Sequence, residues 1–296
     1  MKEDKTPTSI GASYDNLVLV GVQSPSKIKP PADCRGAQMY RVMQSMTRTS
    51  QQVREAYLNI KGRIPKMIYE IANLKVEMDP KYERLMRQSV SYESSGVPVI
   101  RIAPDPNDES RVVMSNPSEE EREYICCSAA FCRKIVRYGR FFLHASAVVY
   151  EGEAYLFSAP SGTGKSTHTA FWRELFPGSY ILNDDKPVIW PDKEQITVWG
   201  TPFAGKTNLQ VNRGVPLKGI CFLKQGSENQ IQQVTEDHAL ALMLNNTWRP
   251  RSNEEMNLLL DMMEEVVSRV TIYEMSCTRE MEAAKLSYRV MKGKGL

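Results

Sequence analysis

The chain has 296 residues, of which 42% are hydrophobic, and a formal net charge of +3. This length accommodates one large or two ordinary domains, and the hydrophobic content is ample for a packed core. So small a net charge gives no support for a general nucleic-acid partner. No run of residues approaches the roughly 18 apolar residues of a membrane span, and the N-terminus leads into no signal-peptide region. We therefore expect a soluble cytoplasmic protein with no membrane partner.

Residues 1–65 are expected to form an N-terminal extension that is partly mobile. Lys, Thr, Ser, Pro and Gln are frequent in its first part, and prolines interrupt any period. One short strand is predicted at 16–22. Apolar residues at helical spacing from Val53 to Ile64 predict one amphipathic helix that ends at Pro65. Both a docking helix and an ordinary packing helix remain open for it.

From residue 66 the pattern becomes that of a compact fold, and residues 66–138 predict a smaller β-rich part followed by a helix. Ser118 followed by three glutamates is a typical helix start, and the helix should reach about Tyr138. Short strands are predicted at two places within 67–78, at 97–102 and at 111–114.

Three of the six cysteines, Cys126, Cys127 and Cys132, fall on this predicted helix. Their spacing fits no paired C-x-x-C metal motif, and their neighbours are apolar. We therefore expect core thiols rather than a metal site.

Residues 139–296 are expected to form the main sheet and its helices. Only one long helix separates the second of its strands from the third, which is not the regular alternation of an ordinary nucleotide-binding domain. The pattern therefore predicts a mixed α/β fold, of the α+β kind with a mixed sheet. The predicted strands lie at 141–150, 154–158, 179–182, 196–199, 217–223 and 270–273, and the predicted helices at 169–175, 236–245, 253–268 and 279–291.

The most informative segment is 159–167, which follows an apolar run and precedes a helix. Its glycines let backbone N–H groups turn toward a polyphosphate, Lys165 can neutralise the β and γ oxygens, and the Ser166 hydroxyl can hold Mg²⁺. The following helix adds the positive end of its dipole. We therefore predict a phosphate-binding loop made by Ser161, Gly162, Thr163, Gly164, Lys165, Ser166 and Thr167.

The strict pattern of such loops has glycine where this chain has Ala159, so we expect the loop to follow a variant path. A Gly-rich turn that only connects two elements is the structural alternative. His168 lies on the first turn of the following helix, where it either reaches the phosphates or faces solvent.

Two adjacent carboxylates, Asp184 and Asp185, follow the predicted strand at 179–182. In phosphoryl transfer one carboxylate typically holds Mg²⁺, directly or through water, while another orients or deprotonates the attacking hydroxyl. This pair fits both tasks. The structural alternative is an Asx turn, because Asn183 precedes the pair and Pro187 follows closely.

Four further residues are candidates with open alternatives. His144, in the predicted strand at 141–150, is either a core residue or part of the site. Lys206, after a stretch of small residues, either closes over the phosphates or lies in a plain turn. Arg249 and Arg251 are cationic candidates for binding substrate or phosphate, with surface salt bridges as the alternative.

Several of these segments together resemble the catalytic domain of HPr kinase/phosphorylase. They are Leu143-His144-Ala145, the hairpin around Gly152, the loop at 161–166 and the segment from Leu182 to Asp185, in this order and at these distances. The resemblance is good over roughly residues 140–225. It implies a P-loop kinase domain, related in fold to phosphoenolpyruvate carboxykinase, over residues 66–296 with its P-loop core at 139–296. The chain looks most like family members of uncertain substrate, some of which accompany peptide natural-product clusters and phosphorylate serine.

The resemblance also implies roles for individual residues. Lys165 and the loop amides would bind phosphates, Ser166 would hold the metal, and Asp184 and Asp185 would be metal-coordinating and base carboxylates, with Asp185 favoured as the base. His144 matches the family's active-site histidine. ATP and Mg²⁺ are the implied cofactors, and the family often assembles as homo-oligomers. The N-terminal region does not resemble the family's regulatory domain, so the resemblance does not extend to HPr as the acceptor.

The sequence thus predicts an ATP- and Mg²⁺-dependent phosphotransferase, a serine kinase acting on a hydroxyl of a peptide, a protein or a small molecule. One alternative is a non-catalytic nucleotide-binding adaptor or sensor. The intact pair Asp184 and Asp185 argues against it, because a sensor needs no base. The other is a carboxykinase-like phosphotransferase, for which no metal-binding His/Lys pair is evident.

Overall fold

The computed structural model describes residues 67–104, 116–160 and 162–293. All of them belong to the second of two compact units into which the chain divides, Lys61–Leu296. Within these ranges, no helix is both long enough and apolar enough to cross a membrane.

Several predictions concern residues outside the described ranges. These are the mobile extension with its strand at 16–22 and its amphipathic helix, the strand at 111–114, and Ser161 of the phosphate-binding loop. They stay predictions.

The first part of the described chain forms a four-stranded sheet in the order β3-β1-β2-β4. Strands β1 (Met67–Ile71) and β2 (Leu74–Met78) form an antiparallel hairpin, as predicted. Its two turn residues, Ala72 and Asn73, both have positive φ, the backbone of a tight two-residue hairpin turn. The remaining elements are β3 (Glu93–Ser94), β4 (Ile100–Arg101), helix α3 (Glu83–Ser89), which was not predicted, and the 3-10 turn η2 (Val90–Tyr92).

Helix α4 (Glu119–Lys134) begins where it was predicted and continues as the 3-10 turn η4 (Ile135–Tyr138). Ser118 and Glu121 form a capping box, in which each side chain accepts the other residue's backbone N–H. Cys126, Cys127 and Cys132 are buried on this helix, so the prediction of core thiols is confirmed. Burial raises the pKa of the Cys127 and Cys132 thiols to about 12, which keeps them protonated.

The later part of the chain forms a nine-stranded sheet. The main order is β5-β9-β10-β11-β7-β6-β8, and β13 joins β11 and carries β12 at its other side. The pairs β11–β7 and β11–β13 are parallel, whereas the others are antiparallel, so the predicted mixed sheet and mixed α/β class are confirmed. The strands are β5 (Phe141–Phe142), β6 (Ala145–Tyr150), β7 (Glu153–Ser158), β8 (Tyr180–Asn183), β9 (Val188–Pro191), β10 (Ile196–Trp199), β11 (Gly214–Gln225), β12 (Gln230–Gln233) and β13 (Thr271–Cys277).

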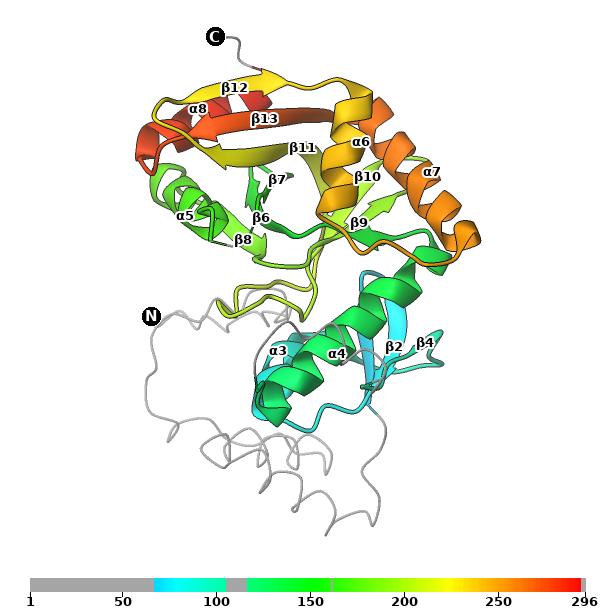
Figure 1. Ribbon diagram of the computed structural model, residues 1–296. Coiled ribbons are helices and arrows are strands. Elements are labelled where there is room, and N and C mark those ends of the chain that lie inside the picture. Colours follow the sequence, from blue (N-terminus) through cyan, green and yellow to red (C-terminus); the bar gives the residue numbers. More distant parts are fainter. Residues whose placement is uncertain (1–66, 105–115, 161, 294–296) are drawn as a thin grey trace, which may run out of the picture. The chain divides into compact units, whose positions relative to one another are not determined.

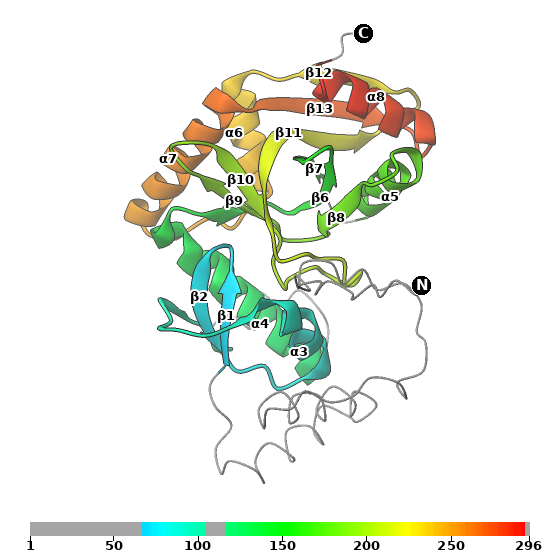
Figure 2. The ribbon, with the colours of Figure 1, turned by 180° about the vertical axis from the view of Figure 1, so that it is seen from behind.

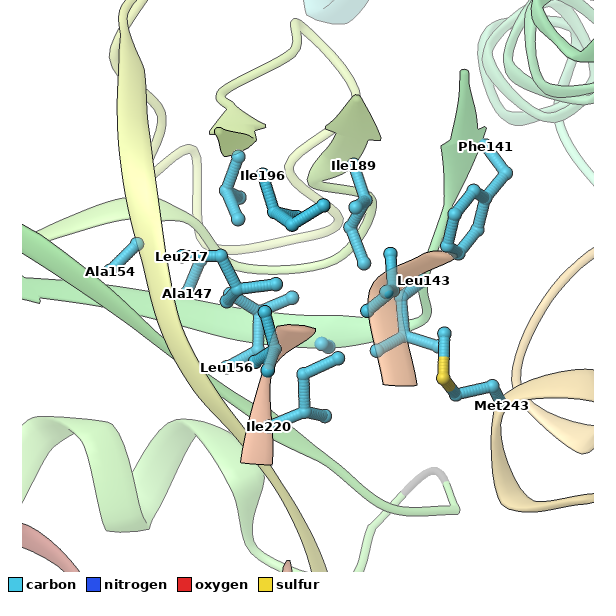
Figure 3. Packing of buried hydrophobic residues seen from close by; sticks show 14 of the residues in the cluster. Phe141, Leu143, Ala147, Ala154, Leu156, Ile189, Ile196, Leu217, Ile220 and Met243 are labelled. Carbon is cyan, nitrogen blue, oxygen red and sulfur yellow. The ribbon is translucent and has the colours of Figure 1, made fainter. Parts of the chain in front are cut away.

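Helices cover both faces of this sheet (Figures 1 and 2). Helices α6 (Glu236–Asn245) and α7 (Asn253–Arg269) pack on one face, with Met243 and Leu259 buried among strand residues. Figure 3 shows part of this apolar cluster, including Leu156, Ile220 and Met243. Helices α5 (Lys165–Leu175) and α8 (Met281–Met291) pack on the other face around Trp172.

Strand β7 illustrates why the central strands read as continuous apolar runs. Ala154 and Leu156 belong to the cluster beneath α6 and α7, whereas Tyr155 and Phe157 belong to the cluster beneath α5 and α8. Successive side chains of a strand point to opposite faces, and here both faces are covered by helices.

The single strand predicted at 141–150 is wrong, because the chain changes partners within it. Strand β5 pairs with β9, and β6 pairs with β7 and β8. The two residues between the strands, Leu143 and His144, belong to neither. An apolar pattern does not reveal such a change of partner. Because of this change, His144 lies in the short connection between β5 and β6.

His168 reaches neither the phosphate side nor solvent, so both alternatives considered for it are wrong. Its ring packs on Phe157 at a centroid distance of 4.5 Å, and its side chain is buried. Its Nε2 lies 2.9 Å from the Oγ of Ser287 on α8, which also accepts a hydrogen bond from Trp172 Nε1 at 3.0 Å. Ser287 donates to the Ala284 carbonyl, which assigns the imidazole proton to Nε2. His168 therefore joins α5 to α8.

We expect this histidine to make stability depend on pH. Burial lowers the pKa of His168 from 6.5 to about 4, so the unfolded chain binds its proton first as the pH falls. The contribution to stability is present above pH 6.5 and is lost as the pH falls from 6.5 toward 4. Between pH 7 and pH 5 the wild type should lose ~2 kcal/mol more unfolding free energy than His168→Gln. Urea unfolding at both pH values checks this, and equal losses in the two proteins would contradict it.

Candidate active site

The predicted phosphate-binding loop joins β7 to α5. Gly162 and Gly164 have φ values of 81° and 115°, the left-handed region in which a side chain would be strained, and Gly164 is the N-cap residue directly before α5. The first turn of α5 carries no acidic residue, so the positive end of the helix dipole is not offset there. Thr163 is partly exposed, and Thr167 is exposed on the first turn. The described residues thus have the strand-loop-helix arrangement that the sequence predicted.

Ala159 occupies the position where the strict loop pattern has glycine. Its φ is not in the left-handed region, and its side chain is buried in the apolar cluster with Phe157 and Trp172. This position therefore needs no glycine, and its methyl group contributes to the core. Its carbonyl accepts a hydrogen bond from Lys165 Nζ at 2.7 Å. Burial lowers the pKa of Lys165, against the opposite effect of Asp185 and Asp184.

The side chains of Ser166 and Asp184 are in contact. The Ser166 hydroxyl lies 3.1 Å from Oδ1 and 3.0 Å from Oδ2 of Asp184, although the two residues are 18 positions apart. Asp184 is buried at the end of β8, and Ser166 is on the first turn of α5. The structure therefore brings together the hydroxyl and the carboxylate that the sequence predicted as metal ligands.

The predicted Asx turn is also present. Asn183 Oδ1 accepts the backbone N–H groups of Asp185 at 3.0 Å and Lys186 at 2.7 Å. Its Nδ2 donates to the Thr201 carbonyl at 2.8 Å, so the Asn183 side chain joins the turn to the segment that follows β10. The two interpretations of this segment were therefore not exclusive, because the turn fixes the backbone from which the two carboxylates project.

Asp185 lies between two nitrogen groups. His144 Nε2 is 3.5 Å from Oδ1, and Lys186 Nζ is 2.5 Å from Oδ2. The His144 backbone is held as well, since its N–H donates to the Asn246 carbonyl at 2.7 Å. Burial lowers the pKa of His144, and the Lys165 charge lowers it further, so this histidine is neutral at pH 7. Burial acts to lower the pKa of Lys186, but Asp185 and Tyr124 raise it above its ordinary value.

Lys206 follows a turn that lies against the site. A side-chain carbon placed on Gly205 would be 3.2 Å from Asp185 Cβ, and Gly205 has a φ of 64°. The Lys206 side chain itself is exposed. The turn's backbone, rather than the lysine, therefore reaches the described site residues.

Arg249 and Arg251 are both exposed in the segment between α6 and α7. Neither forms an ion pair with another described residue. The structure does not place them with the other candidates, and their proposed roles in binding stay predictions.

An open cavity of about 430 Å³ adjoins the loop. The end of β11 lines its other side, where Gln225 Nε2 donates to the Thr163 carbonyl at 3.4 Å. The strand was predicted to end at residue 223, so the approach of its last residues to the loop was not predicted. The lining residues are Pro160, Gly162, Thr163, Leu223, Lys224 and Gln225.

Lys186 is the residue of the site whose role was not foreseen. It stands directly after the two carboxylates, and that adjacency was the available signal. In the structure its ammonium group is half-buried against Asp185 and lies 5.8 Å from the centre of the Tyr124 ring.

Comparison with known proteins identifies a family for this chain. No curated protein matches the chain. A family model described as SynChlorMet cassette protein ScmC matches residues 121–284, which include His144, Lys165, Ser166, Asp184 and Asp185. Because the match covers more than half of the 296 residues, the chain belongs to the ScmC family of SynChlorMet cassette proteins.

Proposed function

We propose that this protein is an ATP- and Mg²⁺-dependent kinase of the HPr-kinase-related type, which transfers a phosphoryl group to a serine-like hydroxyl. The observation that carries the proposal is one juxtaposition. The Ser166 hydroxyl is within hydrogen-bond distance of both carboxylate oxygens of Asp184, and Oδ1 of the neighbouring Asp185 faces His144 Nε2. The segment proposed to bind phosphate and the carboxylate proposed to accept the proton follow the C-terminal ends of β7 and β8.

The loop supplies the groups that bind phosphates. Left-handed Gly162 and Gly164 direct the backbone, and the start of α5 supplies N–H groups that have no partner within the helix, together with a positive dipole end. Lys165 is held on the Ala159 carbonyl, from which its ammonium can turn to a phosphate oxygen. The cavity beside the loop offers room for the nucleoside part of ATP.

The oxygens of Ser166 and Asp184 fit Mg²⁺. This ion prefers hard oxygen ligands and is commonly held by one or two carboxylates together with substrate phosphates. No group of three or more His, Cys, Asp or Glu that could hold a metal occurs among the described residues, and such a substrate-completed site requires none. When bound, the ion would neutralise charge on the phosphate oxygens.

Asp185 is suited to accept the proton of the acceptor hydroxyl. Lys186 donates to its Oδ2 and so fixes the carboxylate with Oδ1 toward His144. Both oxygens of Asp184, in contrast, are next to the Ser166 hydroxyl. This difference favours Asp184 as the metal ligand and Asp185 as the base, with neutral His144 orienting it.

Metal-coupled nucleotide binding tests the first half of the proposal. Ser166→Ala should weaken Mg²⁺-ATP binding on the order of tenfold or more, because a metal ligand is lost, and should change binding of metal-free ATP much less. Titration calorimetry with and without Mg²⁺ measures both affinities. Ser268→Ala, on the exposed side of α7, is the matched control. Equal Mg²⁺-ATP affinity in Ser166→Ala and the wild type would remove Ser166 from the metal site.

Transfer of a labelled γ-phosphoryl group to serine compounds tests the second half. A nucleotide-binding adaptor would bind Mg²⁺-ATP through the same loop and leave the label on the nucleotide.

A further inference from the structure

The turn that contains Gly205 is held by side chains from the smaller sheet's helices. Its N–H donates to the Tyr124 hydroxyl on α4 at 2.8 Å. Its carbonyl accepts hydrogen bonds from Arg84 on α3 at 2.6 Å and from Gln88 on the same helix at 3.3 Å. Both backbone polar groups of Gly205 are thus bound by residues at least 81 positions away. A plain connecting turn needs no such anchoring.

The residues that hold the turn are themselves fixed. The Arg84 guanidinium lies 3.6 Å from the centre of the Tyr124 ring, and the Arg84 backbone N–H donates to the Glu120 carboxylate of α4 at 2.8 Å. Tyr124 is buried and contacts Phe203, two residues before Gly205, with ring centres 6.0 Å apart. The Phe131 ring packs on the Phe203 ring, with ring centres 5.5 Å apart. Helices α3 and α4 therefore form a rigid support for the turn.

This support reaches Asp185 by two routes. The first is close approach, because a side-chain carbon added to Gly205 would lie 3.2 Å from Asp185 Cβ and 3.4 Å from Cγ. The second runs through Lys186, whose ammonium lies 5.8 Å from the Tyr124 ring centre and donates to Asp185 Oδ2. Tyr124 thus contacts the turn through its hydroxyl and faces the Lys186 ammonium with its ring.

We propose that Tyr124 and Arg84 are positioning residues that fix the Asp185 carboxylate through the Gly205 turn and Lys186. The proposal rests on the kinase function proposed above. It differs from simple packing of α3 and α4 on the turn, because packing alone would affect stability without a selective effect on the transfer step.

Tyr124→Phe is the sharpest test, because it removes only the hydroxyl that accepts the Gly205 N–H and keeps the ring next to Arg84, Phe203 and Lys186. Hydrogen exchange at Gly205 should become about tenfold faster in the absence of nucleotide. For phosphoryl transfer to a serine peptide, kcat should fall about tenfold while KM for ATP stays within about twofold. Tyr138→Phe is the matched control, since Tyr138 also bonds a backbone group, the Val99 carbonyl at 2.7 Å.

Gly205→Ala is a second, independent variant. Its methyl group would displace Asp185, and its backbone has positive φ, so kcat should fall further than in Tyr124→Phe while Mg²⁺-ATP still binds. Unchanged exchange at Gly205 in Tyr124→Phe would overturn the proposed anchoring. Faster exchange with unchanged kcat would overturn the positioning role alone. No transfer by the wild type, with the Gly205 amide still protected, would instead overturn the kinase function on which the proposal rests.

Discussion

Asp185→Asn is expected to lower kcat for phosphoryl transfer by ~10²- to 10⁴-fold, the usual contribution of a positioned general base. The amide keeps the size of the carboxylate but cannot accept the acceptor's proton. Asp185 Oδ1 faces His144, whereas both Asp184 oxygens lie on Ser166, so only Asp185 is oriented for this role. Mg²⁺-ATP affinity should change little, because in the proposed site the loop and Asp184, rather than Asp185, hold the phosphates and the metal.

Single-turnover transfer assays measure this effect apart from product release. The matched control is Asp261→Asn, on the exposed side of α7, which should behave as the wild type. Thermal unfolding must accompany the assay, because the variant leaves half-buried Lys186 without its anionic partner. A folded Asp185→Asn protein with the wild-type kcat would show that another group takes the proton.

Lys165→Ala is expected to have the second largest effect, a loss of ~10²- to 10³-fold in kcat, comparable to removing one fixed donor from a transition state. Its ammonium is part of the loop and is nearly buried, so in the proposed site its charge would act on bound phosphates in a medium that screens weakly. In the proposed reaction charge develops on the transferred group, and the variant removes the cation that the loop would supply there. Mg²⁺-ATP affinity should also fall.

The control for this variant is Lys285→Ala on α8, where an exposed lysine pairs only with Glu282 three residues away. Calorimetry gives the affinity, and single-turnover transfer gives the rate. If Lys165→Ala bound Mg²⁺-ATP and transferred phosphate as the wild type does, the loop would have no role in the reaction.

Features fixed by local chemistry were predictable from the sequence. The loop could be recognised because Gly162 and Gly164 are needed for a left-handed backbone. The start of α4 followed from the Ser118 and Glu121 capping box. Helix α6 occupies the predicted residues 236–245, because its apolar period lies between a capping Thr235 and Asn246.

Features that depend on distant partners were not predictable. The break at Leu143 and His144 arises because β5 and β6 pair with different strands, although both halves are apolar. The place of His168 was missed because its partner, Ser287, is 119 residues away on α8. The juxtaposition of His144 with Asp185 was expected from family resemblance, whereas the spacing of these residues along the chain does not indicate it.

The support of the Gly205 turn is of the same kind. Arg84 and Tyr124 bind this turn across 121 and 81 residues. Nothing near either residue in the sequence signals a functional contact, so neither was among the predicted site residues.

The most direct test of the proposed kinase function follows a labelled γ-phosphoryl group. The wild-type protein is incubated with Mg²⁺ and γ-labelled ATP, together with free serine and a peptide library that contains one fixed serine. We predict that label appears on a serine hydroxyl, requires Mg²⁺ and is lost in Asp185→Asn. Tight binding of Mg²⁺-ATP with all label remaining on the nucleotide would contradict it and would identify a nucleotide-binding adaptor.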